Sequence, residues 1–311
     1  MSKITVIGSI NMDLMMSTQN FPGAGETVLG ESFYTDCGGK GANQAIAAAK
    51  LGADVSMIGS VGDDLYGEMM CENLGKYHVD TSSVTIRAQE SSGVAMIVLS
   101  DNDNRIIVSS GANASLLPAY IQEKSEVVAA SKVVLAQLEV PLETVNYGFR
   151  LAKENDCITV LNPSPVQKLP VDLLCNTDIL ILNEHEAEAL INSSVSSVEE
   201  AKDCIPRLLA LGVKQVVLTL GEKGCVYTSG EEIYFQPARK VTAVDTTGAG
   251  DSFCGALISA LAKEISMENA IEFATVVSSM TVTKKGTSSS FPTLEEVKEI
   301  QKKEGANIEL P

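Results

Sequence analysis

The sequence of 311 residues has no tryptophan, only two histidines, and seven cysteines without a C-x-x-C pair among them. His78 and His185 lie outside any H-E-x-x-H pattern, so a zinc hydrolase site is excluded, and we expect both side chains at the surface. An odd number of widely spaced cysteines favours neither a disulfide framework nor a zinc ribbon. We therefore expect reduced thiols, with Cys254 a buried and inert one.

Basic residues are also scarce. The chain has 23 Lys and Arg against 40 Asp and Glu, which gives a formal net charge of −17. Nucleic acids and anionic membranes recruit clustered cations, so neither is expected as a partner. A phosphorylated small ligand remains compatible with this charge, because backbone amides and Mg²⁺ can hold phosphate.

Long apolar runs are missing as well. No stretch approaches the roughly 18 apolar residues that a membrane-spanning helix needs. The N-terminal run ITVIGSINMD is too short for a signal peptide and is interrupted by Asp13. We therefore expect a cytoplasmic protein.

The sequence does contain a regular alternation of short β-branched runs and helix-like segments. The runs typical of buried strands are 4–8, 55–59, 133–138, 158–162, 179–183 and 216–221. Helical spacing of apolar residues marks 42–49, 64–75, 118–130, 143–155 and 198–211. Segments 224–229 and 232–237 indicate a later antiparallel pair, followed by helices from residue 250. This order predicts an α/β fold with a mostly parallel central sheet and helices on both faces.

Two regions interrupt that alternation. Residues 26–37 alternate without a helix to follow them, and residues 93–111 are typical of a hairpin with a polar turn at 100–104. Together they predict a small β-sheet lid, formed by about 12–37 and 93–111 and inserted in a single domain spanning 1–311. The alternative is that these segments extend one edge of the main sheet.

Polar residues follow several of the predicted strands. Asn11 and Asp13 follow the first strand, Glu139 follows 133–138, and the segment from Asn183 to Glu186 ends 179–183. Ligands of open parallel sheets bind beyond the carboxyl ends of the strands, so these side chains predict a binding crevice at one edge.

Two glycine clusters carry the strongest local signal, GGKGANQA at 38–45 and DTTGAGDSFCGA at 245–256. The first is not a Walker A loop, because Ser or Thr does not follow a Gly-Lys pair, and it fits G-x-G-x-x-G poorly. Glycines before a helix expose backbone N–H groups to an anion. In the second cluster, however, a carboxylate, Asp251, follows the glycines directly, where it would repel a bound phosphate.

These two motifs, in this order and about two hundred residues apart, closely resemble signatures of the ribokinase family of PfkB-type sugar kinases. The resemblance extends along essentially the whole chain. GSINMD at 8–13, LNPSP at 161–165 and NEHEAE at 183–188 resemble the ribokinase branch in particular.

The resemblance implies a role for each matching position. Asp251 matches the catalytic base, and the amides of Gly248, Ala249 and Gly250 match an anion hole for the γ-phosphate. Positions matching the sugar site are Asn11, Asp13, Gly39, Lys40, Gly41, Asn43, Glu139 and Asp251. Positions matching the ATP site are Asn183, Thr219, Gly221, Gly224, Gly250 and Thr275. Asn183 and Glu186 match a pair that binds Mg²⁺ through water. Positions matching a K⁺ loop, mostly through backbone carbonyls, are Asp245, Thr247, Thr281, Lys284, Gly286 and Ser290.

The function that follows as an expectation is ATP-dependent phosphorylation of D-ribose at its 5-hydroxyl, with Mg²⁺ required and K⁺ activating. Asp251 would then face the attacking hydroxyl, while its neighbours' amides face the phosphoryl group. Deoxyribose, another furanose or a nucleoside remain alternative acceptors, and a non-catalytic sugar sensor on the same fold is a further alternative. We also expect a homodimer formed through the lid.

Overall fold

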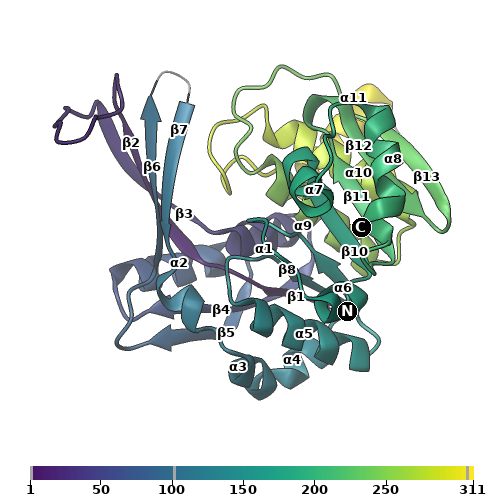
Figure 1. Ribbon diagram of the computed structural model, residues 1–311, viewed down its shortest axis with the longest axis horizontal. Coiled ribbons are helices and arrows are strands. Elements are labelled where there is room, and N and C mark those ends of the chain that lie inside the picture. The colour runs from purple at the N-terminus through teal and green to yellow at the C-terminus, as the bar shows by residue number, and fades with distance from the viewer. Residues whose placement is uncertain (1–2, 101–102, 306–307) are drawn as a thin grey trace.

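The computed structural model describes residues 3–100, 103–305 and 308–311, and it has the expected α/β architecture (Figure 1). Its main sheet has nine strands in the order β13-β12-β11-β10-β9-β8-β1-β4-β5. Their bounds are β1 (Lys3–Ile7), β4 (Asp54–Gly62), β5 (Asp80–Arg87), β8 (Val133–Ala136), β9 (Ile158–Leu161), β10 (Ile179–Asn183), β11 (Gln215–Thr219), β12 (Gly224–Ser229) and β13 (Glu232–Pro237). The strands from β5 to β11 pair in parallel, whereas β12 and β13 pair antiparallel.

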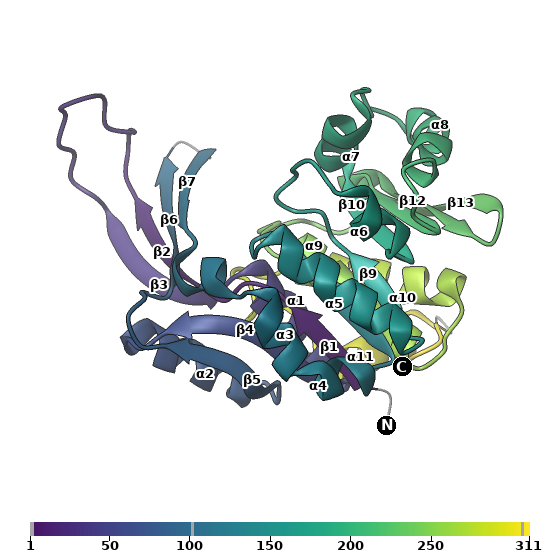
Figure 2. The ribbon, with the colours of Figure 1, turned by 60° about the horizontal axis from the view of Figure 1, so that its bottom comes forward.

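Helices cover both faces of this sheet, and each face has its own apolar core (Figure 2). On one face lie α1 (Lys40–Lys50), α2 (Leu65–Lys76), α9 (Ala249–Ala262), α10 (Met267–Thr281) and α11 (Leu294–Glu304). On the other lie α3 (Pro118–Glu123), α4 (Ser125–Ala129), α5 (Leu142–Glu154), α6 (Val171–Cys175), α7 (Glu184–Ile191) and α8 (Val198–Leu209). Covered on both sides, a central strand such as β8 is built from a continuous apolar run, VVLA, that is buried throughout.

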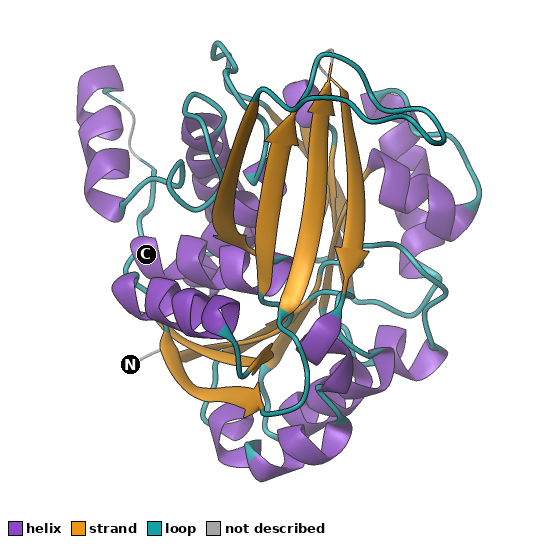
Figure 3. Ribbon diagram, turned by 90° about the vertical axis from the view of Figure 1, so that its left-hand side faces the viewer, coloured by secondary structure: helices purple, strands orange, loops and turns teal. Residues whose placement is uncertain are grey.

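A second sheet of four strands stands away from the main sheet, at the left of Figure 1 and facing the viewer in Figure 3. Its order is β3 (Ser32–Gly38), β2 (Asn11–Ser17), β6 (Gly93–Ser100) and β7 (Asp103–Ser109). The small sheet is therefore separate, and it does not extend an edge of the main sheet.

Most expected elements are present, with instructive differences at their ends. The helix expected at 118–130 is divided at Lys124 into α3 and α4. Of the expected segment 26–37, only the part from Ser32 onward is a strand. The expected hairpin is formed by β6 and β7, and the middle of its polar turn, 101–102, lies outside the described residues. Strand β5 and helices α6 and α7 were not predicted, because their short or mixed patterns lack a clear period.

Local features expected from composition are also visible. All seven cysteines are free thiols. Burial raises the pKa of Cys254 well above its usual value, so its thiol stays protonated. The side chain of His185 is 93% exposed, and His78 is exposed as well. None of the helices within the described ranges has the length and hydropathy needed for a bilayer crossing.

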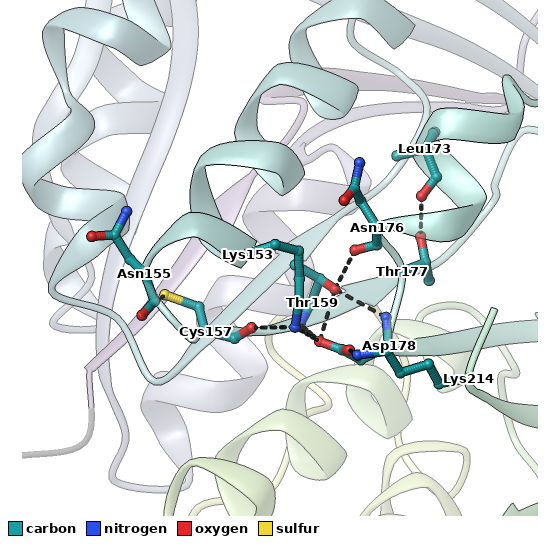
Figure 4. Close-up of polar contacts among 9 residues, drawn as sticks. All are labelled: Lys153, Asn155, Cys157, Thr159, Leu173, Asn176, Thr177, Asp178 and Lys214. Atoms are coloured by element: carbon teal, nitrogen blue, oxygen red, sulfur yellow. Dashed lines mark hydrogen bonds and ion pairs between the residues drawn. The ribbon is translucent and has the colours of Figure 1, made fainter. Parts of the chain in front are cut away.

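An ionic cluster holds the sheet together at the amino ends of its strands (Figure 4). Asp178, directly before β10, accepts hydrogen bonds from Nζ of Lys153 at 2.6 Å and from the amide of Thr159 at 2.9 Å. Nζ of Lys214 lies 2.7 Å from its other oxygen. Burial acts to raise the pKa of Asp178, but these donors outweigh it and hold the pKa below its usual value. The cluster ties β9, β10 and β11 together on the side away from the carboxyl ends of the strands.

Candidate active site

Helices α1 and α9 pack close together because small residues line their contact. A Cβ atom on Gly255 would lie 2.5 Å from Cβ of Ala47 and 2.9 Å from the amide nitrogen of Ala48, so a side chain has no room there. The alanine-rich sequence of α1 is thus required by its neighbour α9. This packing brings the first turn of α9, with Asp251, beside the first turn of α1.

The carboxylate of Asp251 is bound by two amide side chains of α1. Nδ2 of Asn43 lies 3.2 Å from Oδ2, and Nε2 of Gln44 lies 2.9 Å from Oδ1. Burial raises the pKa of Asp251 above its usual value, and the ammonium of Lys40 together with the two amides opposes that rise. Asp251 is therefore a buried carboxyl group in which nearby donors oppose, but do not cancel, the effect of burial on its pKa.

One polar atom of the Asn43 side chain has no hydrogen-bond partner. Its side chain is 6% exposed, and its Oδ1 atom is buried without a hydrogen-bond partner. A buried acceptor without a donor costs free energy, and a water, an ion or a role in the chemistry of a site are the usual reasons for one. Oδ1 of Asn43 is thus suited to accept a hydrogen bond from a ligand hydroxyl beside Asp251.

A second carboxylate, Glu139, follows β8 at the same edge of the sheet. Its Oε2 atom accepts hydrogen bonds from Oγ of Ser9 at 2.5 Å, from the amide of Lys40 at 3.3 Å and from Nδ2 of Asn11 at 3.4 Å. Asn113, buried in the short 3₁₀ helix Gly111–Ser115, donates from Nδ2 to Oδ1 of Asn11 at 2.8 Å. Loops after two separate strands are thereby joined into one polar wall.

Asp13 enters the site from the small sheet. Its pKa is raised to about 7, first by burial and then by the carboxylates of Asp36, Glu139 and Asp251, while Lys40 lowers it. The site thus gathers acids around one lysine, which favours a ligand rich in hydroxyl donors.

The glycines of GGKGANQA allow these groups to meet. Gly39 has φ of 91°, and a Cβ atom there would lie 2.7 Å from the amide nitrogen of Asn11. A Cβ atom on Gly41 would lie 2.7 Å from the carbonyl carbon of Gly8. Glycine is therefore required at both positions so that α1 can start directly against the loop after β1.

A cavity of about 490 Å³ opens beside Asn11 and Glu139. Val108 and Ser110, at the end of β7, line it on one side. The remaining lining residues are Ala114, Leu138, Val140, Pro141, Leu142, Pro165 and Gln167. The polar wall is thus open to a small molecule between the main sheet and the small sheet.

Helix α9 starts at Gly248, whose left-handed φ of 75° and contacts require glycine. A Cβ atom there would lie 2.8 Å from Cε1 of Phe291. The first intrahelical bond runs from the amide of Ser252 to the carbonyl of Gly248, so earlier amides face the helix start. The amide of Ala249 already donates to the carbonyl of Thr246 at 3.2 Å, whereas Gly250 is exposed. Of the three expected anion-hole amides, that of Ala249 thus has a backbone partner, and Gly250 is the exposed residue of the three.

Asn183 and Glu186 form a reciprocal capping box at the start of α7. The amide of Glu186 donates to Oδ1 of Asn183 at 2.9 Å, and the amide of Asn183 donates to Oε2 of Glu186 at 3.0 Å. Oxygen ligands suit Mg²⁺, which keeps several waters and binds few protein groups. Among the described residues there is no cluster of three or more His, Cys, Asp or Glu that could hold a metal ion.

Three of the positions expected on the nucleotide side, Thr219, Gly221 and Gly224, lie at the carboxyl end of β11 or just after it. Oγ1 of Thr219 donates to the carbonyl of Leu182 at 3.3 Å. Gly221 and Gly224 both have positive φ, and a Cβ atom on Gly224 would lie 2.0 Å from the carbonyl oxygen of Gln236. Thr275 is buried on α10, and its hydroxyl donates within that helix to Ile271. The structure therefore gives the Thr275 side chain a partner of its own.

The expected K⁺ positions lie on two segments, one before α9 and one from the end of α10 onward. Asp245 accepts hydrogen bonds from the amides of Thr247 at 2.9 Å and Gly286 at 3.0 Å, which joins the two segments. Thr281 and Ser290 direct their hydroxyls to backbone carbonyls of their own segments. Nζ of Lys284 lies 2.7 Å from Glu296. These side chains are thus occupied, which leaves backbone carbonyls as the groups that fit a monovalent cation.

Several residues at the centre of the site were not assigned from the sequence. They are Ser9, Gln44, Asn113, Gln137 and Asn162, all hydrogen-bonded to expected site residues or to one another. Gln44 adjoins Asn43 in the first glycine motif, and Gln137 and Asn162 stand at the carboxyl ends of β8 and β9. For Gln137 and Asn162, a position at the carboxyl end of a predicted strand was therefore the sequence feature that could have identified them as site residues.

The fold and the site together define a class of protein. An open parallel sheet presents a buried carboxylate, Asp251, at a glycine-initiated helix start, and a cavity opens at the same edge beside Glu139. This arrangement is the one expected of a small-molecule kinase, in which a base, anion-binding amides and an acceptor pocket must meet at one phosphorus atom.

Comparisons with known proteins place the chain within that class. Residues 1–294 match the pfkB family of carbohydrate kinases, and the chain belongs to that family. It is 41% identical over 300 residues to the ribokinase of Bacillus subtilis, covering 96% of this chain and 99% of that protein. It is 36% identical over 298 residues to a deoxyribokinase of Salmonella typhimurium, covering 95% and 97%. The structure of Arabidopsis thaliana ribokinase complexed with ribose and ATP superposes with a TM-score of 0.92 at 32% identity, covering 97% and 99%.

Proposed function

We propose that this protein transfers the γ-phosphoryl group of ATP to the 5-hydroxyl of D-ribose, giving D-ribose 5-phosphate and ADP. The observation that carries the proposal is the position of Asp251, which lies both at the start of α9 and beside the unpartnered Oδ1 of Asn43. Relatives named ribokinase, and a similar structure that holds ribose and ATP, support this choice of substrates.

The proposed chemistry uses few groups of the chain. The carboxylate of Asp251 accepts the proton of the 5-hydroxyl as the new O–P bond forms. The bond between the γ-phosphorus and the bridging oxygen breaks, and its electron pair leaves on ADP. Charge on the transferring oxygens is stabilised by the amide of Gly250 and the dipole of α9. The proton on Asp251 passes to solvent after the products leave.

The other polar groups hold the sugar. Asn11, Asp13, Asn43 and Glu139 offer acceptors to its hydroxyls, and a sugar lacking a matched hydroxyl leaves one of them unpaired in the closed site. Lys40 lies near the same acids. Burial acts to lower the pKa of its ammonium group, but the negative charges of these acids outweigh burial and raise the pKa above its usual value. Lys40 therefore stays charged and offsets the acids around the sugar.

Two cations belong to the proposal. Asn183 and Glu186 would hold Mg²⁺ through water, where it neutralises phosphate charge. The backbone of the loop joined by Asp245 and Gly286 would hold K⁺, which steadies the start of α9. Side chains that already have partners in this loop support binding through carbonyls.

The small sheet is proposed to act as a lid and as the contact of a homodimer. Its face away from Asp13 carries exposed apolar side chains: Met16 at 43%, Phe33 at 59%, Met96 at 50% and Ile107 at 71%. Covering such a surface is favourable at about 25 cal/mol per Å² of apolar area. Closure over the sugar would exclude water and suppress ATP hydrolysis. A monomeric mass by analytical ultracentrifugation at micromolar concentration would contradict the dimer.

A cytoplasmic location, where ATP is supplied, completes the proposal.

An ATP-coupled activity panel tests the function. D-Ribose, deoxyribose, fructose and adenosine are compared with and without K⁺, and the phosphorylated position is identified by NMR. The proposal requires ribose to have the highest kcat/KM and to carry the phosphate on its 5-oxygen. A preference for deoxyribose, which one relative's name raises, would keep the chemistry and replace the substrate. Sugar binding without any turnover would contradict the kinase activity and support the alternative of a non-catalytic sugar sensor.

A further inference from the structure

A row of three amide side chains lies behind the carboxylate of Asp251. Gln44 on α1 and Gln137 after β8 are both 0% exposed, and Asn162 follows β9. Nε2 of Gln44 donates to Oδ1 of Asp251 at 2.9 Å and to Oδ1 of Asn162 at 3.1 Å. Oε1 of Gln44 accepts from Nε2 of Gln137 at 2.5 Å. Both ends of the Gln44 amide are thus engaged.

A hydrogen bond to one backbone carbonyl determines which end of each amide group is nitrogen and which is oxygen. Nδ2 of Asn162 donates to the carbonyl of Ile181 at 3.1 Å. A carbonyl can only accept, so Asn162 must turn its nitrogen to Ile181 and its oxygen to Gln44. Gln44 must then turn its nitrogen to two acceptors at once. A flipped Gln44 would place oxygen against oxygen at both contacts, so its donor toward Asp251 is held in place.

From this arrangement we infer that Gln44 is a positioning residue for the phosphoryl transfer: its fixed donor keeps Asp251 ionised and leaves Oδ2 to face the sugar hydroxyl. The inference rests on the proposed function of Asp251. Oδ1 is occupied by Gln44, whereas Oδ2 has only the longer contact with Asn43. The amide of Gln44 neither takes nor gives a proton in the reaction, which passes from the hydroxyl to Asp251.

The charged surroundings of Asp251 explain why this donor matters. Burial raises the pKa of Asp251, and Glu139 adds to the rise. Asp13 on β2 is coupled to the same carboxylate through space and acts in the same direction. The opposing groups are the ammonium of Lys40 and the amides of Gln44 and Asn43. Cys254, on α9 itself, stays neutral because its own pKa is raised well above the usual value. Without Gln44, the ionised form would lose a donor that is fixed in place.

The test compares Gln44→Met with the unchanged protein by two readouts. One is the pH dependence of single-turnover phosphoryl transfer to D-ribose, and the other is a ¹³C NMR titration of the Asp251 carboxyl in the ligand-free protein, assigned with Asp251→Asn. A hydrogen bond to a charged group is worth enough to move both midpoints upward by about one to two pH units. At pH values below both midpoints the rate is then about 10- to 100-fold lower than in the unchanged protein, and the difference disappears at pH values above both midpoints. Affinity for ribose changes little.

Two further variants keep the test decisive. Gln44→Glu preserves the shape of the side chain if Gln44→Met does not fold. Its carboxyl group and that of Asp251 titrate as a pair, and the midpoint for loss of the second proton moves upward. Gln137→Met is the matched control, since it opens the same buried row but removes no donor to Asp251, and it keeps the original midpoints. Midpoints that stay in place in both Gln44 variants, or that move equally in Gln137→Met, overturn the inference. Absence of turnover in the unchanged protein would overturn the proposed function instead, and the NMR midpoints would still decide the role of Gln44.

Discussion

Nδ2 of Asn43 lies 3.2 Å from Oδ2 of Asp251, although 208 positions separate the two residues in the chain. The contact joins the first turns of α1 and α9, and it depends on Gly255, where no side chain fits between the helices. Each of the two glycine motifs therefore supplies half of one site. In the proposed function, the first provides the sugar side, and the second provides the base and the anion-binding backbone.

Asp251→Asn removes the proposed base and keeps the shape of the side chain. We expect kcat to fall by about 10²- to 10⁴-fold, the usual contribution of a general base, while ribose still binds. Stopped-time assays give kcat, and isothermal titration calorimetry gives the affinity for ribose. Turnover within threefold or so of the unchanged protein would remove Asp251 from the mechanism.

Asn43→Ala tests whether its buried Oδ1 accepts from a sugar hydroxyl next to the 5-hydroxyl, whose own proton goes to Asp251. Loss of one neutral hydrogen bond predicts an affinity for ribose about 2- to 10-fold weaker. The matched ligands are deoxy sugars that each lack one hydroxyl other than the 5-hydroxyl. One of them should bind the unchanged protein more weakly than ribose does, and that difference should nearly vanish in the variant. Equal discrimination by both proteins for every deoxy sugar would mean that Asn43 accepts from none of these hydroxyls.

The sequence predicted much of the fold because buried parallel strands are continuous β-branched runs, as VVLA in β8 illustrates. It missed β5, DTSSVTIR, because its burial is partial and its apolar pattern is mixed. The site was predicted where glycines or acids mark it, as at Asp251 and Gly248. Gln44 and Asn113 were missed because a buried amide has no period or spacing of its own, and only tertiary packing reveals its partner.

Gly248→Ala tests the start of α9. An alanine at φ of 75° costs about 1–2 kcal/mol for its backbone alone, and its Cβ would meet Phe291 at 2.8 Å. Displacement of the helix start should lower kcat by about 10²-fold or more, as loss of an anion-hole donor does. Steady-state assays and urea unfolding measure the two effects.

Gly230→Ala is the control for that backbone cost. Gly230 also has positive φ, at 60°, but nothing lies within 4 Å of the Cβ position. We expect a similar backbone destabilisation and unchanged kcat. An equal fall in kcat in both variants would show that the effect comes from general destabilisation and not from the helix start.

Asp178→Ala removes the centre of the ionic cluster that Figure 4 shows, far from the proposed chemistry. The side chain is only 14% exposed, and its loss removes the ionic partner of Lys153, which keeps only its hydrogen bond to the carbonyl of Cys157. We expect a loss of roughly 2–3 kcal/mol in the free energy of unfolding, measured in urea, with kcat unchanged. Since the folded pKa of Asp178 lies below its usual value, this contribution is present at neutral pH and is lost as the pH falls through the folded pKa. Glu264→Gln, which breaks an exposed pair with Lys132, should change stability little.

Asp13 makes sugar binding depend on pH near neutrality. Burial and neighbouring acids raise its pKa from 3.8 to about 7 in the ligand-free protein. A carboxyl group with a raised folded pKa contributes stability below its unfolded pKa and loses it as the pH rises through the folded value. The ligand-free protein should therefore lose stability from this group between about pH 4 and pH 8.

Sugar hydroxyls donate to the ionised form of Asp13, so binding should lower that pKa and release a proton. We expect the affinity for ribose to rise with pH through about 7, and calorimetry in two buffers of different ionisation enthalpy to detect the proton released near that pH. Asp13→Asn should abolish both the release and the pH dependence. Asp36→Asn, which removes a repelling carboxylate from the paired position on β3, should move the midpoint to lower pH. Binding of ribose without proton release near pH 7, in a protein that still has Asp13, would mean that this carboxyl group does not accept a sugar hydroxyl in its ionised form.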